Sequence, residues 1–418
     1  MAQWHQQSNG LPGTWILAWA LDVLDSSTAV LSVSEGIYYT SDAGNSWTEI
    51  SLPDSITATT IDISIADKTH IWAATESGFI YATSDAGLNW KKQFENPTLT
   101  EFMNYVEMFD LNNGIAMGDG MQLAGPALFL RTTDGGENWI SVNDSAFGGY
   151  SGDTWRRLDF LSTDTGYFFE SGLNPQLLFR TEDGCNSWES IAGLRGVTNL
   201  KCFNRDLIIA GGYDCSGPNC IPIIQLSSDG GNHWEIFEVE MGYGNDFEYD
   251  PADPSRIYYA TSNGLFFSAD SGRNWGKLPL PVDEVYGRDL GFANSDNGWL
   301  LCDDGFLFHI SNAGSVITEI RENSRIQITD IRNFNLYQNY PNPFNPVTKL
   351  SYEIPVQDKV KITLFDLRGR EIKTIVDEIK LPGRYELTID GTGLSSGVYM
   401  VVMNSGSFTG AVKIILLK

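Results

Sequence analysis

Aromatic and charged side chains gather in three stretches that also carry turn-forming residues: 146–157, 240–249 and 281–289. Aromatic faces beside a few charged groups suit the recognition of sugar rings or peptides. The pattern therefore predicts a binding site for a carbohydrate or a peptide, although Trp155 and Tyr286 could instead fill gaps between structural elements. The candidate ligand-binding residues are Tyr150, Trp155, Arg156, Tyr243, Asp246, Tyr286 and Arg288.

Catalytic chemistry has less support in the sequence. His5, His70, His233 and His309 are scattered, and the chain contains no HExxH, GxSxG or Gly-rich phosphate-binding motif. The stretch at 110–120, "DLNNGIAMGDG", lacks the spacing and the final Glu of an EF-hand. The sequence thus predicts no cofactor and no metal. An inverting glycosidase needs two carboxylates roughly 6.5–9.5 Å apart, and so acidic a chain offers many pairs without singling one out.

A repeated box marks the elements that would position these loops. Its pattern is Ser/Thr-x-Asp-x-Gly-x-x-Trp, as in "TSDAGNSW" at 40–47 and "TSDAGLNW" at 83–90. Four further copies follow, one with Cys185 in place of Gly, and a worn seventh at 310–317 lacks both Asp and Trp. Copies recur every 41 to 49 residues. That interval, with alternating apolar residues and Gly turns before each box, predicts an all-β, seven-bladed β-propeller.

Each box is expected to be the hairpin turn between the third and fourth strands of a blade. Its Asp can accept hydrogen bonds from backbone N–H groups, and its Gly can adopt a positive φ at which a side chain would clash. Its Trp can fold back between sheets and bury roughly 150–250 Å². The residues interpreted as structural are Asp42, Trp47, Asp85, Trp90, Asp134, Trp139, Asp183, Trp188, Asp229, Trp234, Asp270 and Trp275.

The repeat resembles the Asp-box, or bacterial neuraminidase repeat (BNR), family, which includes sialidases, sortilin-like receptors, xyloglucanases and the photosystem II assembly factor. The resemblance implies the fold and places the boxes at the periphery, away from the ligand. Sialidases carry an early Arg-Ile-Pro stretch, whereas the Arg-Ile pairs here begin at Arg256 and Arg325 and lack Pro. Xyloglucanases use a cleft between two propellers, and this chain has repeats for one. The assembly factors bind protein through a basic patch. Because the propeller here is strongly acidic, the sequence does not predict a partner of that type.

Ring closure is expected to involve the start of the chain. "QWHQQSNGLP" at 3–12 is similar to "SWTEISLP" at 46–53, which follows the first box. Because the seventh box has lost its Trp, we expect Trp4 to lie in the outer strand of the seventh blade.

After about residue 330 the Asp-box repeats end, and a proline-rich turn and short apolar strands follow. We predict a propeller at 1–325, a linker at 326–335 and an immunoglobulin-like β-sandwich at 336–418, because six or seven short strands fit into the last segment. Five motifs stand in order along it: "YPNPFNP" at 340–346, "FDLRGRE" at 365–371, "LPGRYEL" at 381–387, "LSSGVYMVVM" at 394–403 and "VKIILLK" at 412–418. Together they closely resemble the type A C-terminal sorting domain of the type IX secretion system.

The second resemblance implies export across the outer membrane of a Gram-negative bacterium. The secretion machinery would be the partner of residues 336–418, and the protein would be secreted or attached to the outer cell surface. The amino terminus lacks a basic segment followed by an apolar one, so we expect that a signal peptide has been removed. No apolar run approaches the length of a membrane span. In an oxidising compartment, Cys215 and Cys220 are expected to form a disulfide across "SGPN".

The net charge of −26 argues against nucleic acid as a partner. Residues 333–418 carry ten Lys/Arg and eight Asp/Glu, which leaves −28 on residues 1–332. The sequence therefore predicts a secreted or cell-surface binding protein with an unknown extracellular protein or glycan as its ligand. One alternative is an extracellular glycoside hydrolase that acts on a polysaccharide. Another is a structural module of an extracellular assembly.

Overall fold

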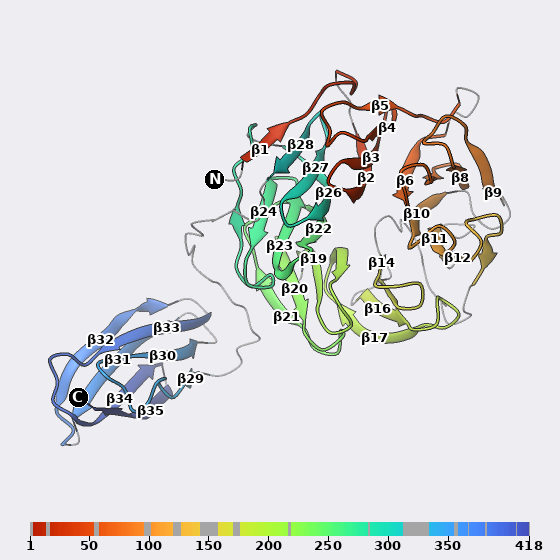
Figure 1. Ribbon diagram of the computed structural model, residues 1–418. Helices are drawn as coiled ribbons and strands as arrows, with labels where there is room; N and C mark the ends of the chain where they lie inside the picture. The colour runs from red at the N-terminus through yellow and green to blue at the C-terminus, as the bar shows by residue number, and fades with distance from the viewer. Residues whose placement is uncertain are drawn as a thin grey trace. The chain divides into compact units, whose positions relative to one another are not determined.

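The computed structural model divides into two compact units at Asn323/Ser324, and every regular element in its described residues is a β-strand (Figure 1). None of these residues forms a helix that could cross a membrane. The predicted linker falls mostly outside the described residues, so the predicted domain bounds stay a prediction. The described ranges are 3–13, 17–53, 58–95, 102–119, 127–142, 158–169, 176–215, 219–282, 285–311, 334–354, 358–366, 368–380, 383–406 and 408–417.

The first unit contains seven four-stranded sheets around a ring, which confirms the predicted seven-bladed propeller (Figure 1). From the centre outward, blade 1 is β2 (Ala18–Asp25), β3 (Thr28–Val33), β4 (Gly36–Thr40) and β5 (Thr48–Glu49); blade 2 is β6 (Thr60–Ile65), β7 (Ile71–Thr75), β8 (Phe79–Thr83) and β9 (Lys91–Glu95); blade 3 is β10 (Met103–Met108), β11 (Gly114–Gly118), β12 (Leu128–Thr132) and β13 (Ile140–Ser141); blade 4 is β14 (Leu158–Phe160), β15 (Gly166–Phe169), β16 (Gln176–Thr181) and β17 (Glu189–Leu194). Blade 5 is β18 (Val197–Cys202), β19 (Ile208–Asp214), β20 (Ile221–Ser227) and β21 (Glu235–Glu238); blade 6 is β22 (Gly244–Asp250), β23 (Asp253–Thr261), β24 (Gly264–Ser268) and β25 (Gly276–Lys277); blade 7 is β26 (Gly287–Asn294), β27 (Asn297–Cys302), β28 (Leu307–Ser311) and β1 (Gln3–Gln6).

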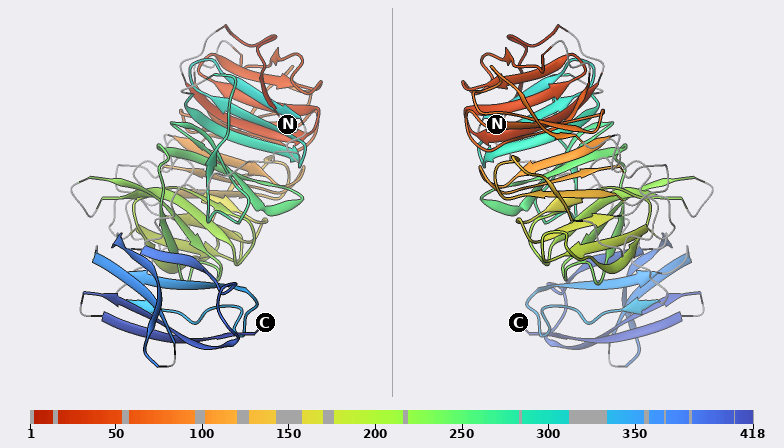
Figure 2. Two further views of the ribbon diagram at one scale, coloured as in Figure 1. Left: turned by 90° about the vertical axis from the view of Figure 1, so that its left-hand side faces the viewer. Right: turned by 90° about the vertical axis from the view of Figure 1, so that its right-hand side faces the viewer.

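The first strand of the chain completes the last blade. β1 pairs antiparallel with β28, and Trp4 lies opposite Ile310. The Trp4 side chain is 3% exposed and packs in an apolar core with Tyr258 of blade 6 and Phe308 of blade 7. The strands of blade 1 (red) and blade 7 (teal) are neighbours in the ring, as Figure 2 shows. The start of the chain therefore closes the ring and supplies an indole to the blade whose own box has none.

The Asp-box turns share one hydrogen-bond pattern, which the first copy illustrates. The Thr40 hydroxyl donates to Asp42 Oδ1 (2.9 Å) and accepts the Gly44 N–H (3.0 Å), while Asp42 accepts the Ser46 N–H (2.9 Å). The same three contacts recur in each of the next five copies. The carboxylate therefore holds the turn together, which agrees with a structural role for the box. The seventh box lies, from residue 312 on, outside the described residues.

Left-handed backbone explains the glycine of the box. A Cβ added at Gly87, where φ is +85°, would lie 2.4 Å from the Ile50 Cβ, so a side chain cannot fit there. Cys185 occupies the same position in the fourth box with a φ of 68°, and it is fully buried. The expectation that a side chain clashes at this position is therefore wrong for blade 4, where the core accommodates the thiol.

The box tryptophans pack at the junctions between consecutive blades. Trp47, for example, is 3% exposed and shares a core with Trp299 and Leu307 of blade 7. Trp188 is also buried, whereas the other indoles are half-buried. The apolar clusters that contain Trp90, Trp139, Trp188 and Trp234 each join a blade to the preceding one. The Trp275 ring lies near that of Phe247, in the innermost strand of its own blade. The half-buried indoles are Trp90, Trp139, Trp234 and Trp275.

The second unit is a sandwich of two sheets. One sheet has the order β29 (Asn335–Leu336), β30 (Val347–Ile354) and β33 (Gly383–Asp390), and the other has β32 (Glu371–Lys380), β31 (Asp358–Asp366), β34 (Gly397–Ser405) and β35 (Phe408–Leu416). Leu350 and Tyr352 of the first sheet share a core with Ile362, Val401 and Ile414 of the second. This arrangement agrees with the sandwich that the short alternating strands predict.

Candidate binding surface

The predicted ligand-binding residues belong to connections that enter the innermost strands. Tyr150, Trp155 and Arg156 lie outside the described residues. Tyr243 directly precedes β22, and Tyr286 directly precedes β26. Because strand direction alternates within a blade, these connections lie on the face opposite the Asp boxes. We call this face the mouth face, since the innermost strands begin there around the central channel.

An aromatic cluster lies on the mouth face. Tyr243 is 61% exposed, and its ring centroid lies 4.5 Å from that of Tyr213, with the rings tilted by 44°. Burial raises the pKa of Tyr213, and the neighbouring Tyr243 and Tyr286 raise it further. Within the described part of the chain, the buried Tyr213 hydroxyl has no hydrogen-bond partner. We call Tyr213, Tyr243 and Tyr286 the mouth cluster.

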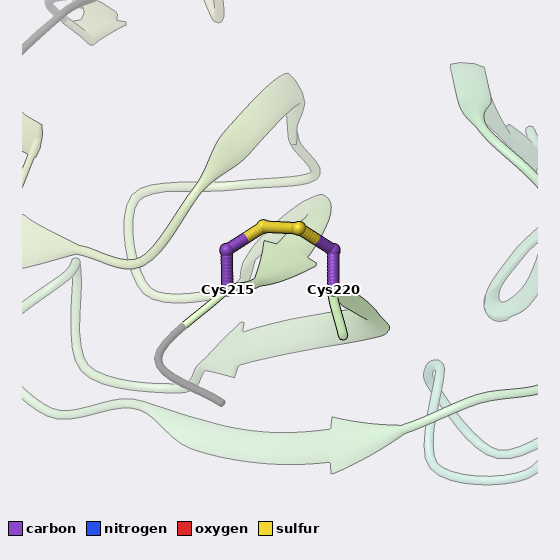
Figure 3. Close-up of a disulfide and its surroundings, with 2 residues drawn as sticks. All are labelled: Cys215 and Cys220. Carbon is purple, nitrogen blue, oxygen red and sulfur yellow. A yellow bond between two sulfur atoms is a disulfide. The ribbon is translucent and has the colours of Figure 1, made fainter. Parts of the chain in front are cut away.

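A disulfide closes the turn next to the mouth cluster. Tyr213 is the second-last residue of β19. Cys215 directly follows this strand and is bonded to Cys220, which directly precedes β20 (Figure 3). Asp214, the residue before Cys215, also forms an ion pair: its Oδ2 lies 3.4 Å from Arg195 Nη1, and the Arg195 side chain is 59% exposed. The cross-link limits the conformations of the hairpin that carries Tyr213, and it is consistent with an oxidising environment.

The Arg288 side chain is engaged in contacts within the mouth face. Its Nε donates to Asp303 Oδ2 (2.8 Å), and its guanidinium lies 4.7 Å from the Tyr286 ring centroid. The other Asp303 oxygen accepts the N–H of Ala18 (2.9 Å), which ties blade 7 to blade 1. The guanidinium therefore anchors one face of Tyr286, and a ligand would meet the aromatic side chain instead of the cation.

Asp246 lies inside the channel. Its Oδ2 accepts the N–H of Leu290 in the next blade (3.0 Å). The structure thus brings Tyr243 and Tyr286 into the mouth cluster, places Arg288 behind it, and assigns Asp246 to a different set of residues.

That set consists of two tiers of side chains that line the channel, and the sequence reading missed it. The pairing of each innermost strand with its neighbour fixes which residues are equivalent. In the tier nearer the mouth, the described positions are Ala20, Asp62, Tyr105, Asn199, Asp246 and Asp289. The deeper tier is Asp22, Ser64, Glu107, Asp159, Lys201, Glu248 and Gly291.

Side chains in both tiers join neighbouring blades. In the tier nearer the mouth, Asp62 accepts the N–H of Val106 (2.9 Å), one blade further on. In the deeper tier, Asp22 accepts the N–H of Ile65 (2.7 Å) in the same way. Asp246, Asp289, Ser64 and Asp159 each accept the equivalent N–H of the following blade. Most channel carboxylates therefore act as links between innermost strands.

Lys201 is the cation of the deeper tier. Its Nζ lies 3.1 Å from Glu248 Oε2 and 3.8 Å from Asp159 Oδ1, on the two flanking blades. Burial acts to lower the pKa of Lys201, but the carboxylates of Glu248, Asp159 and Asp246 outweigh it and hold the pKa well above its usual value. The lysine is therefore charged and neutralises part of an acidic channel.

Glu107 is the channel carboxyl with the most altered titration. Burial raises its pKa to about 8, against a hydrogen bond from the Tyr105 hydroxyl on the same strand. Burial also raises the pKa of Asp159 to about 6 and that of Asp22 to about 6. At neutral pH the Glu107 carboxyl is therefore mostly protonated, while Asp159 and Asp22 are mostly ionised.

Raising the pH from about 5 to about 8 is expected to lower the free energy of unfolding by at least about 2 kcal/mol, since each unit of pKa shift is worth about 1.4 kcal/mol. The folded pKa values of Glu107, Asp159 and Asp22 lie above the unfolded ones, so the folded state binds extra protons at low pH. Their stabilisation is lost as the pH rises through the folded values. Asp229 acts oppositely, because the hydrogen bond from His233 lowers its pKa to about 2, but its contribution changes only below about pH 4.

Urea unfolding at several pH values would measure this dependence. The variant Glu107→Gln should give a flatter profile, because it removes the group with the largest shift. Equal free energies of unfolding at pH 5 and pH 8 for the unaltered chain would contradict the assignment.

A second hollow in the described structure lies away from the channel and offers no pair of catalytic carboxylates. A surface cavity of about 280 Å³ in blade 6 is lined by Asn263, Gly264, Lys277, Leu278, Pro279, Leu280, Val282 and Val285. Its lining has one cation and no carboxylate. Among the described residues, no group of three or more His, Cys, Asp and Glu side chains could hold a metal ion.

Two segments of the chain, one in each unit, match known protein families. Residues 338–417 match the secretion system C-terminal sorting domain, and residues 20–118 match the photosynthesis system II assembly factor YCF48. No curated protein matches the chain in sequence.

Solved structures with the same fold include two examples of YCF48 and a glycoside hydrolase. YCF48 bound to D1 peptide has a TM-score of 0.59 at 18% identity, over 74% of this chain and 97% of that chain. YCF48 from Cyanidioschyzon merolae has a TM-score of 0.57 at 16% identity, over 74% and 99%. The GH74 xyloglucanase from Xanthomonas campestris has a TM-score of 0.56 at 14% identity, over 84% of this chain but 60% of the enzyme. At such identities the similarity shows the fold alone.

The sequence repeat, the seven closed blades and the two family matches agree with one another. The chain is a BNR-type β-propeller followed by a type IX secretion system C-terminal sorting domain, and it is accordingly a secreted or cell-surface protein.

Proposed function

We propose that the propeller is an extracellular recognition module that binds its ligand at the mouth cluster. The observation that carries this proposal is the position of Tyr243, which is 61% exposed although its ring is held against Tyr213. An exposed aromatic ring on a fixed support loses little conformational entropy on binding. The disulfide beside Tyr213 adds to this preorganisation.

Relatives with the same fold support a binding role. One of them is YCF48, whose structure was solved with a D1 peptide. A propeller of this type can therefore carry a peptide site. For the present chain, the class of the extracellular ligand, protein or glycan, remains part of the proposal, and the export domain supports a ligand outside the cell.

Glycoside hydrolysis is the second candidate function. Glu107 and Asp159 project into the channel from adjacent blades, with pKa values of about 8 and about 6. Pairs of carboxyl groups whose environments separate their pKa values can serve as acid and base. Against this role, Asp159 accepts the N–H of Cys202 (2.6 Å) and lies near Lys201, so its lone pairs are largely engaged.

The variant Tyr243→Ala is expected to weaken ligand binding by at least about tenfold, because exposed aromatic anchors commonly contribute 2 kcal/mol or more. Peptide and glycan arrays probed with the full chain would identify a ligand, and titration calorimetry would compare the variants. Leu88→Ala is a matched control, since Leu88 is 82% exposed at an Asp-box turn on the opposite face.

The outcomes separate the candidate functions. Binding that Tyr243→Ala weakens and Leu88→Ala spares supports recognition at the mouth. Turnover of a polysaccharide that Glu107→Gln abolishes would favour the hydrolase. Neither binding nor turnover on any probe, together with self-association, would leave the structural module as the better account.

A further inference from the structure

The sorting domain exposes apolar side chains at one place. Among its described residues, the exposed large hydrophobic side chains are Tyr337 (37%), Tyr340 (82%), Val347 (44%) and Leu417 (54%). Tyr340 is the first residue of the segment 340–346, Tyr337 and Val347 lie on either side of it in the chain, and the Leu417 N–H bonds to the Phe344 carbonyl within it. We call these four exposed residues the turn patch. Soluble domains seldom leave clustered apolar groups in water unless another molecule covers them.

One end of this segment is fastened to the last strand. The Phe344 side chain is 2% exposed, its N–H donates to the Ile415 carbonyl (2.9 Å), and its carbonyl accepts the Leu417 N–H (2.9 Å). The Asn342 side chain accepts the Ile415 N–H (2.9 Å) and donates to the Lys413 carbonyl (3.1 Å). Leu417 is therefore held beside the segment by its own backbone.

The other end is fastened to β30. Tyr340 and Lys349 exchange two backbone hydrogen bonds, of 2.9 and 3.1 Å. The buried Asn339 side chain donates to the Pro341 carbonyl (3.0 Å) and to the Thr348 hydroxyl (2.9 Å). A backbone this well anchored presents the Tyr340 ring to solvent in a fixed place. The exposed ring does not stabilise the folded domain, but a binding partner could bury it and gain apolar contact.

Positive charge borders the turn patch. Lys349 lies directly across from Tyr340, and Lys413 precedes the strand end that carries Leu417; both lysines are exposed. A complementary surface would be apolar at its centre and acidic at its edge.

We propose that the turn patch is the surface through which the sorting domain docks on the type IX export machinery, onto an apolar pocket bordered by carboxylates. Export is the role of the family that residues 338–417 match, so the machinery is the partner that this domain must meet. The patch combines the first and last segments of the domain. Only the folded domain presents it, and removal of either end destroys it.

The full chain, delivered to the periplasm of a bacterium with an active type IX system, provides the test. The variants are Tyr340→Ser, Leu417→Ser and the pair together, with Lys373→Ser as the control, since Lys373 is exposed on β32 and lies outside the five sorting-domain motifs. The ratio of extracellular to periplasmic protein is measured for each. For the double variant we expect this ratio to fall at least about tenfold, as for a loss of about 1.4 kcal/mol in docking.

Thermal unfolding of the purified variants distinguishes docking from misfolding. Because Tyr340 and Leu417 are exposed, the double variant should retain the Tm of the unaltered chain while it accumulates in the periplasm. Charge reversal by Lys349→Glu and Lys413→Glu should reduce export in the same way. Normal export of the double variant, or an equal loss in Lys373→Ser, would overturn the proposal. Tyr243→Ala should be exported normally, which separates this inference from the function proposed for the propeller.

Discussion

Replacing Lys201 with methionine is expected to lower the free energy of unfolding by about 3 kcal/mol at neutral pH, a typical cost for breaking a buried ion pair by removing one partner. Lys201 is 23% exposed, and the carboxylates of Asp159 and Glu248 on the flanking blades are 16% and 19% exposed. Methionine preserves most of the side-chain length but removes the charge. Two carboxylates then remain close together in a region that solvates them poorly.

Two comparisons isolate the electrostatic part of this effect. Lys201→Arg keeps the cation and should therefore cost less than Lys201→Met, because neither carboxylate loses its ionic partner. For Lys201→Met, the loss should be smaller at about pH 5, where Asp159, whose pKa is about 6, is mostly protonated even with the lysine present. Urea unfolding at the two pH values gives both quantities. A methionine variant as stable as the unaltered chain at pH 8 would show that the channel lysine does not support the ring.

The propeller could be predicted from the sequence because the residues of each box form hydrogen bonds with one another within one short turn. Thr40, Asp42 and Ser46 satisfy one another within eight residues, so the same letters must recur wherever the same turn recurs. The seventh box differs from the others, and this difference indicated where the ring closes. Its missing indole pointed to Trp4, since an apolar junction between two blades cannot be left empty.

The channel tiers could not be predicted with the same ease, because their partners are distant in the sequence. Asp22 accepts its hydrogen bond from Ile65, 43 residues further along the chain, and Asp289 accepts its own from Leu21, in the adjacent blade but 268 residues earlier in the sequence. A signal was nevertheless present: charged residues interrupt the innermost apolar strands, as in "ALDVLD" at 20–25 and "NLKCF" at 199–203. A charge at an alternate position of a buried strand indicates a polar lining shared by all blades.

The mouth residues show the limit of reading loops by composition. Tyr243 is exposed, whereas Arg288 forms an ion pair with Asp303, and Asp246 accepts a hydrogen bond from the next blade. Residue type alone does not reveal whether a charged group in a loop faces solvent or anchors a neighbouring strand. Register and strand order decide that question, and both are properties of the closed ring.

Truncating Trp4 to alanine is expected to destabilise the propeller by about 3–5 kcal/mol, the usual cost of deleting a large buried aromatic side chain. The indole is 3% exposed between blades 6 and 7, and in the described structure its N–H has no hydrogen-bond partner, so packing alone supplies its contribution. Trp4→Phe should therefore recover a large part of the loss. His5→Ala, on the exposed side of the same strand, should change the stability by less than about 0.5 kcal/mol.

Deletion of residues 1–9 should have a larger effect than Trp4→Ala, because it also removes the strand that pairs with β28. The edge of β28 would then be unpaired, and the last blade would have three strands in a ring that depends on complete blades. Thermal and urea unfolding of the four variants would give the order of stability: His5→Ala, Trp4→Phe, Trp4→Ala and the deletion, from most to least stable. If the deletion unfolds at the same temperature as the unaltered chain, then β1 does not close the propeller, and the junction between blades 6 and 7 must be held by apolar contacts within those two blades.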